Sequence, residues 1–145
     1  MPSKTFDAIF TEVEKASKKA DKIRILKENS SPLLKQILGL TYDPRVVWLL
    51  PEGTPPYTPL PTSADAEITI QNASRQFYLF VEGISTTQRN LKQLKRETLF
   101  IQLLESVNPA ETKVLLGMKE RKLPYRGLTR KLVAEAFPNL AKDWF

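Results

Sequence analysis

The sequence of 145 residues contains no cysteine and no histidine. Without cysteine there is no disulfide and no thiol nucleophile. Without either residue nearly every zinc site is excluded, because proteins usually bind zinc through these side chains. The commonest general base of nucleophilic catalysis is missing as well. We therefore expect no metal site and no cofactor.

Other catalytic signals are also missing. The sequence has no Gly-Lys-Ser or Gly-Lys-Thr of a phosphate-binding loop and no Asp-x-Asp pair. Asp7, Glu12 and Glu14 lie in a lysine-rich amphipathic segment, which is a poor setting for a magnesium-dependent active site. The protein is expected not to be an enzyme.

Long hydrophobic runs are absent too. A membrane-spanning helix needs roughly 18 or more consecutive apolar residues, and no such run occurs. The N-terminus is polar and amphipathic and has no apolar core of a secretion signal. These features predict a cytoplasmic protein without a membrane partner.

What the chain has in excess is positive charge. Lysine and arginine number 22 against 16 acidic residues, so the net charge is +6. The hydrophobic content of 41% is enough for one folded core. A basic protein of this kind favours polyanionic partners: nucleic acid first, an acidic membrane surface or an acidic protein second.

Hydrophobic residues recur at helical spacing along most of the chain, and period-two alternation is nowhere sustained. Ser31-Pro32 and Asn108-Pro109 are typical helix starts. The pattern predicts a single all-α domain over residues 1–145, with 138–145 as a short C-terminal tail. The expected helices are residues 6–16, 23–26, 32–40, the second half of 64–82 as far as Gly83, 85–106, 109–118 and 128–137.

Two segments are harder to assign. Tyr42–Leu50 is short and apolar; either a brief helix or an extended run fits it, and we favour the helix. Residues 51–61 contain five prolines in eleven positions, which predicts a stiff loop, with Tyr57 attaching that loop to the body.

The helix expected at 85–106 begins at N-caps among Ser85, Thr86 and Thr87. Its predicted buried side is formed by Leu91, Leu94, Leu99, Ile101, Leu103 and Leu104. Its predicted exposed side carries Arg89, Lys92, Lys95 and Arg96.

The segment 119–131 carries the strongest functional signal, with six basic residues and one acidic residue around a Gly-Leu-Thr corner. A corner that opens a helix presents unpaired N–H groups and a positive dipole end, which together favour a phosphate. The alternative is a helix cap on a solvated basic surface. The candidate DNA-binding residues are Lys119, Arg121, Lys122, Tyr125, Arg126, Gly127, Leu128, Thr129, Arg130 and Lys131.

Two further basic runs accompany this corner. One comprises Lys15, Lys18, Lys19, Lys22, Arg24 and Lys27, and the other is the basic side of residues 89–96. Each could be an ordinary solvated helix face. If all three runs shared one side of the fold, DNA binding would depend steeply on salt.

The chain ends in Trp144 and Phe145 on a short tether. One interpretation docks both rings into the domain's own core. The other makes them anchors for a partner protein, because aromatic side chains bury a large area at low entropic cost. In that second interpretation the tail resembles the sliding-clamp-binding tails of phage replication and late-transcription proteins.

Two parts of the chain together resemble the N-terminal DNA-binding domain of bacteriophage-type ATP-dependent DNA ligases. They are residues 6–42, with Lys22-Ile-Arg-Ile-Leu-Lys-Glu-Asn at their centre, and residues 111–138, with the corner Lys122–Thr129. The overall pattern also resembles an uncharacterised family of small proteins in myophages of marine cyanobacteria. No Lys-x-Asp-Gly nucleotidyl-transfer motif is present, so ligation by these residues alone is excluded.

The resemblance implies an all-α module that grips double-stranded DNA, with the N–H groups of Gly127, Leu128 and Thr129 against a phosphate. The expected function is that of a phage accessory factor in replication, repair or transcription, in the cytoplasm of the host bacterium. A module that binds a sliding clamp, a polymerase or a host protein through its basic faces or its C-terminal aromatic tail is the alternative. A basic virion or assembly component is a third possibility.

Overall fold

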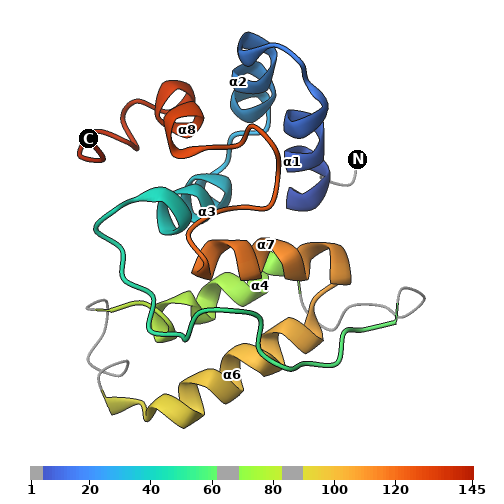
Figure 1. Cartoon of the computed structure of the whole chain (residues 1–145), viewed down its shortest axis with the longest axis vertical. Coiled ribbons are helices and arrows are strands. Elements are labelled where there is room, and N and C mark those ends of the chain that lie inside the picture. The colour runs from blue at the N-terminus through green and yellow to red at the C-terminus, as the bar shows by residue number, and fades with distance from the viewer. Residues whose placement is uncertain (1–4, 62–68, 83–89) are drawn as a thin grey trace.

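The computed structural model describes residues 5–61, 69–82 and 90–145 (Figure 1). This part of the chain is mostly helical and contains no strand, only an isolated bridge between Trp48 and Val81. The helical fold class is therefore confirmed. The α-helices are α1 (Phe6–Lys15), α2 (Lys19–Glu28), α3 (Pro32–Tyr42), α4 (Ile70–Ala73), α6 (Gln93–Ser106), α7 (Pro109–Lys119) and α8 (Arg130–Ala136), and the 3-10 helix η1 spans Ser74–Leu79.

Side-chain caps determine several of the helix starts. Ser31 accepts a hydrogen bond from the N–H of Leu34 at 3.0 Å, and Asn108 accepts one from the N–H of Ala110 at 2.9 Å. A proline opens each of these two helices, where its missing N–H costs nothing. The predicted starts of α3 and α7 are thus confirmed.

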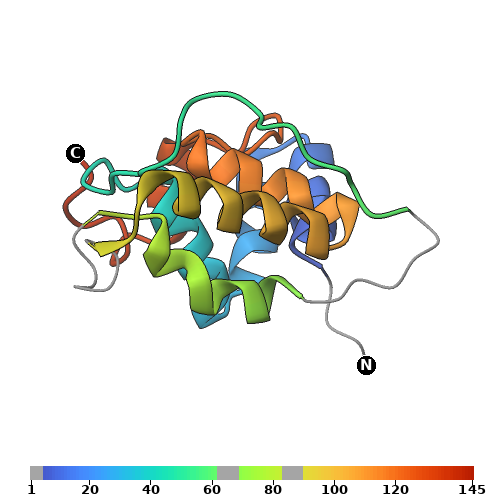
Figure 2. The same ribbon diagram turned by 90° about the horizontal axis from the view of Figure 1, so that it is seen from below.

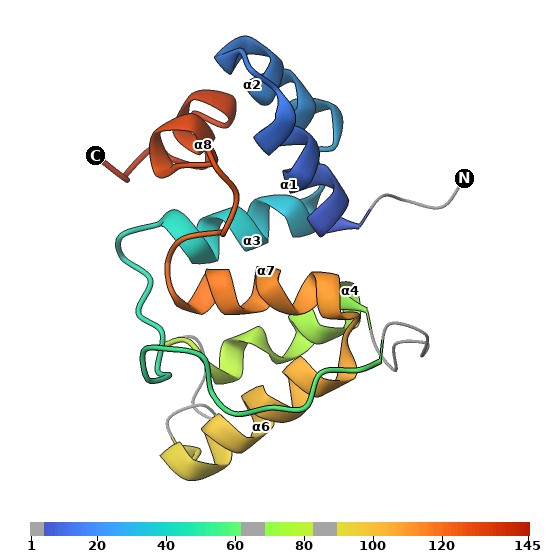
Figure 3. The ribbon, with the colours of Figure 1, turned by 45° about the vertical axis from the view of Figure 1, so that its right-hand side comes forward.

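The helices form three groups along the long axis of the molecule (Figures 1 and 3). Helices α1, α2 and α8 lie at one end, α3 and α7 cross the middle, and α4, η1 and α6 lie at the other end. The central helix α7 packs against α3, α1 and α6. The core that joins these layers includes Phe10, Leu34, Leu38, Phe80, Leu104, Leu115, Met118 and Leu128.

The helix favoured for Tyr42–Leu50 is not formed. Helix α3 ends at Tyr42, and the chain then turns and runs beside residues 80–82. The N–H of Leu49 donates to the carbonyl of Phe80 at 2.8 Å, and the N–H of Glu82 donates to that of Val47 at 2.9 Å. Pairing with a segment about 30 residues away in the sequence therefore replaces the local helix.

The helical segment after residue 69 is shorter than predicted. One α-helical turn, α4, passes into the 3-10 helix η1, and the helical backbone ends at Leu79. The expected end at Gly83 and the expected N-caps at residues 85–87 lie outside the described residues.

Helix α6 corrects two predictions about which side chains are buried. It begins at Gln93, Leu94 is 78% exposed, and Arg96 is only 6% exposed. The Arg96 guanidinium turns inward, where Nε donates to the carbonyl of Leu79 at 2.9 Å and Nη2 to that of Leu91 at 3.2 Å. Both carbonyls lie outside α6, and the buried guanidinium gives each of them a hydrogen-bond donor.

The proline-rich segment is a loop, as predicted, and it runs along the side of the molecule past α6 and α7 (Figure 2). Its backbone is held at Thr58, whose N–H donates to Oε2 of Glu105 at 2.8 Å. Tyr57 is half-buried and packs against the core.

A close approach at Gly117 positions the segment that follows α7. A Cβ atom there would lie 2.8 Å from Cδ of Pro124 and 3.0 Å from the carbonyl oxygen of Lys122.

Gly117→Ala is therefore expected to lower the free energy of unfolding by about 1 to 3 kcal/mol through overpacking, measured by urea titration. Gly39→Ala is the control, because its added methyl would meet Leu140 at an ordinary 3.6 Å; equal losses in both variants would contradict the prediction.

Candidate nucleic-acid interface

Lys119 does not face solvent, contrary to its predicted role. It is 7% exposed, and its ammonium group donates to the carbonyls of Pro51 and Gly53 at 3.0 and 2.7 Å. It also pairs with Oε1 of Glu120 at 2.6 Å. That carboxylate accepts the N–H of Gly53 as well, and the Lys119 contact holds the pKa of Glu120 below its usual range. Lys119 therefore attaches the proline-rich loop to α7.

Arg121 also turns inward. Its guanidinium donates to the carbonyls of Val46 at 2.8 Å, Leu40 at 3.4 Å and Asp43. Burial lowers the pKa of Arg121. The residue has a φ of 68°, in the left-handed region that non-glycine residues rarely adopt. The Arg121 side chain therefore joins the end of α7 to the end of α3. In this arrangement its guanidinium cannot contact a phosphate.

Two further candidates belong to the core. The Tyr125 hydroxyl donates to Oδ1 of Asp7 at 2.7 Å, and burial together with this contact raises the pKa of Tyr125. Leu128 is fully enclosed, and its carbonyl accepts the Tyr42 hydroxyl at 3.0 Å. Their role is to attach the corner to α1 and α3.

The predicted backbone cradle is partly occupied by the protein's own groups. Oε2 of Glu14 accepts the N–H of Arg126 at 2.6 Å, and the N–H of Leu128 donates to the carbonyl of Tyr125 at 3.1 Å. The Thr129 hydroxyl accepts from the N–H of Leu132 at 3.2 Å and so caps α8. The expectation of an open amide cradle at Gly127–Thr129 is corrected accordingly.

The remaining cations of the corner do reach solvent. Lys122, Arg126, Arg130 and Lys131 are exposed, and within the described ranges no carboxylate forms an ion pair with any of them. Arg130 is partly engaged, because its Nε donates to the carbonyl of Tyr42 at 2.8 Å. The side chains of Lys122, Arg126 and Lys131 have neither an ion-pair nor a hydrogen-bond partner among the described residues.

The structure brings this corner against the basic run of α1 and α2. Helix α2 packs on α8, and a Cβ atom at Gly127 would lie 3.1 Å from Nζ of Lys22. An open hollow of about 330 Å³ forms between them, lined by Ser17, Lys19, Lys22, Gly127, Thr129, Lys131, Leu132 and Glu135. We call the cations of this region the junction surface: Lys15, Lys18, Lys19, Lys22, Arg126 and Lys131.

Not all of these cations are equally available. Lys22 donates to the carbonyl of Val13 at 2.7 Å, which caps the end of α1. Lys19 pairs with Oε1 of Glu135 at 2.6 Å. Lys15 and Lys18 are exposed and have no ion-pair partner among the residues that the structure describes.

The third basic run does not join the junction surface. Helix α6 lies at the opposite end of the molecule from α2 and α8 (Figures 1 and 3). Arg96 is buried there, and Arg89 is outside the described residues. Two of the three runs therefore share a surface.

The two aromatic residues of the C-terminal tail lie in different environments. Trp144 is 4% exposed and packs into the core, whereas Phe145 is 84% exposed. Arg45 holds the tail through Oδ2 of Asp143 at 3.4 Å and also pairs with Asp43 at 2.9 Å. Trp144 thus follows the core-docking alternative, and a single exposed aromatic side chain is common on protein surfaces.

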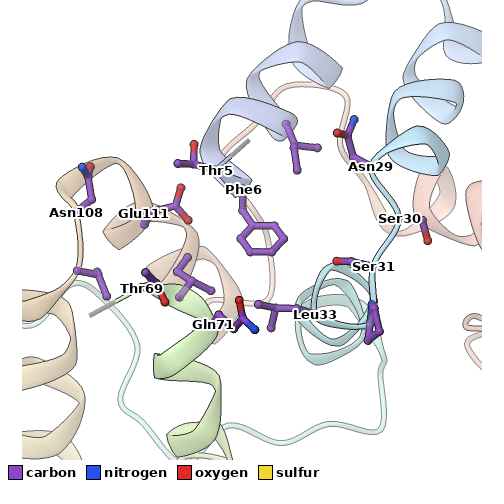
Figure 4. Close-up of a pocket in the computed structure, with 14 residues that line it drawn as sticks. Thr5, Phe6, Asn29, Ser30, Ser31, Leu33, Thr69, Gln71, Asn108 and Glu111 are labelled. Carbon is purple, nitrogen blue, oxygen red and sulfur yellow. The ribbon is translucent and has the colours of Figure 1, made fainter. Parts of the chain in front are cut away.

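A larger hollow, of about 750 Å³, lies away from the junction surface between the starts of α1, α4 and α7 and the turn from α2 to α3 (Figure 4). Phe6 points into it, and its wall includes the buried carboxyl of Glu111. Oε1 of Glu111 accepts the N–H of Asp7 at 3.1 Å, and burial raises the pKa of Glu111. Glu111 thereby ties α1 to α7. Among the described residues that line the hollow, the one charged side chain is acidic, which is unsuited to nucleic acid.

Sequence reasoning missed the acidic members of the interface, Glu14 and Glu135. Each contacts a segment more than 110 residues away. Their helical spacing marks them only as surface residues, so no local signal could have identified these contacts.

No metal-binding group of acidic residues occurs in residues 5–61, 69–82 and 90–145. Over the same residues, no helix is both long enough and apolar enough to cross a membrane.

No curated protein and no solved structure matches the chain. Residues 9–125, from α1 to the start of the corner, match the model of a family described as "Family of unknown function (DUF6433)". Since this match covers most of the sequence, the chain belongs to the DUF6433 family.

Proposed function

We propose that the protein binds double-stranded DNA through its phosphate backbone, as a non-enzymatic accessory factor. The observation that carries the proposal is the junction surface, where two basic runs about 100 residues apart in the sequence lie against each other around an open hollow. A cluster of lysine and arginine side chains on one face is the electrostatic footprint of polyanion binding.

The chemistry of the surface favours phosphates over bases. Flexible lysines neutralise phosphates, and the hydroxyls of Ser17 and Thr129 in the hollow are additional hydrogen-bond donors. Among the described residues, Lys22 is the one cation of the surface that donates to a backbone carbonyl, which leaves five others for phosphates. If all five contact phosphates, the logarithm of the affinity should fall against the logarithm of the salt concentration with a slope of roughly −4 to −5.

The double variant Arg126→Glu, Lys131→Glu is expected to weaken binding to duplex DNA at least about tenfold at low salt, because it removes two phosphate contacts and adds repulsion. Fluorescence anisotropy with two duplexes of unrelated sequence should show equal losses for both, since phosphate contacts carry no sequence information. Circular dichroism checks that helicity is unchanged.

The matched control is Lys92→Glu, Lys95→Glu, which makes the same change of net charge at the exposed N-cap and an exposed first-turn position of α6. It should retain most of the affinity. Equal weakening by both variants would show that only net charge matters, and undetectable or salt-independent binding by the wild type would overturn the proposal. Binding of an acidic protein in place of DNA would support the alternative of a protein-interaction module that uses the same surface.

A further inference from the structure

Among the described residues that line the hollow of the junction surface, one has a carboxylate, Glu135 on α8. Its Oε1 lies 2.6 Å from Nζ of Lys19 on α2. Its other oxygen, Oε2, is buried and has no hydrogen-bond partner within the described part of the chain. A carboxylate with one unsatisfied buried oxygen is poorly accommodated, because that oxygen has lost its water without gaining a donor.

The surroundings of Glu135 are those of an anion site. Lys22 and Lys131 line the same hollow, together with the hydroxyls of Ser17 and Thr129. Helix α2 begins beside the hollow, and its N-cap residue, Lys18, makes no side-chain capping bond. Cations, hydroxyls and an uncapped helix start together supply more donors than one carboxylate uses.

The contact between Lys19 and Glu135 is weak enough to be exchanged. The two side chains are 57% and 35% exposed, and exposed ion pairs are typically worth about 1 kcal/mol or less. A phosphate brings more acceptor oxygens than a carboxylate and forms stronger charge-assisted hydrogen bonds with several donors at once.

We propose that this hollow is a binding site for a phosphate group of the DNA backbone, and that Glu135 occupies the position of that phosphate in the free protein. The inference rests on the proposed function. The incoming phosphate replaces the Glu135 carboxylate as the ion-pair partner of Lys19. Because the carboxylate competes with the phosphate for Lys19, it lowers the affinity of the site for DNA.

Glu135→Gln tests this competition. Glutamine keeps the shape of the side chain but releases Lys19 from its ion pair, so affinity for a duplex should rise about threefold to fivefold at low salt. The salt dependence should keep its slope, because Lys19 contacts the phosphate in both proteins.

Two comparisons isolate the contact from the change of net charge. Glu82→Gln, at an exposed position outside the junction surface, makes the same change of charge and should leave affinity nearly unaltered. In a Lys19→Met background, Glu135→Gln should no longer increase affinity, because the competition acts through Lys19.

Each outcome of these titrations has a distinct meaning. A gain restricted to Glu135→Gln and abolished by Lys19→Met supports the site. A wild-type protein that binds duplex DNA but shows no gain in Glu135→Gln, an equal gain in Glu82→Gln, or a gain that survives Lys19→Met overturns the inference while the proposed function stands. Absence of duplex binding by wild type and variants alike overturns the proposed function and this inference with it.

Discussion

Replacing Arg121 with alanine is expected to lower the free energy of unfolding by about 3 kcal/mol. The guanidinium donates to three carbonyls, those of Leu40, Asp43 and Val46. A hydrogen bond to a charged group contributes roughly 1.5 to 3 kcal/mol net of the exchange with water. The three bonds share one guanidinium that is only partly buried, so their contributions do not add in full, and truncation leaves partly buried acceptors without a donor. Chemical denaturation followed by circular dichroism measures the loss.

The backbone at Arg121 provides an internal check. Its φ of 68° costs a non-glycine residue roughly 1 to 2 kcal/mol, and alanine keeps that cost while losing the hydrogen bonds. Arg121→Gly should therefore be less destabilised than Arg121→Ala by about 1 kcal/mol. The exposed Arg45→Ala, which loses surface ion pairs, should change the stability far less, because solvent screens such pairs; equal losses of stability in Arg45→Ala and Arg121→Ala would refute this account.

The second large effect is loss of stability in alkali. Burial raises the pKa of Tyr42 from 10.0 to about 12, and burial also raises that of Tyr125. Between pH 10 and 12 the unfolded chain therefore loses tyrosine protons that the folded protein keeps. Stability from these groups is fully present below pH 10 and is lost as the pH rises. For Tyr42 alone the loss is roughly 2 kcal/mol at pH 12 and levels off just below 3 kcal/mol at higher pH.

Tyr42→Phe separates this effect from general alkaline unfolding. The variant loses the hydroxyl that donates to the carbonyl of Leu128 and accepts the N–H of Leu123, so at pH 7 it should be less stable by about 1 to 3 kcal/mol. Above pH 10 its stability should fall less steeply than that of the wild type. Tyr78→Phe, on an exposed ring, is the control, and parallel pH profiles for all three proteins would contradict the assignment to Tyr42.

Helix starts were predictable because their signals are local. Ser31 and Asn108 each accept from an amide within three residues, so the caps of α3 and α7 can be inferred from a short stretch of sequence. Trp48 illustrates the opposite case: its segment is fixed by pairing with Val81, and that partner is not apparent from residues 42–50.

The candidate site was predicted less well, because charge alone does not tell whether a cation faces inward. Lys119, Arg121 and Arg96 all satisfy carbonyls from other segments, and those acceptors exist only once the chain has folded. The meeting of Lys22 with Gly127, in contrast, joins two basic runs that the sequence had identified separately.

The contacts of the corner have a consequence for synthesis. Tyr125 bonds to Asp7, and the backbone of Arg126 bonds to Glu14, so each contact joins residues more than 110 positions apart. Neither contact can form until the segment 125–126 has been synthesised, long after α1. A fragment that stops before Tyr125 would therefore lack both contacts and could not hold the corner against α1.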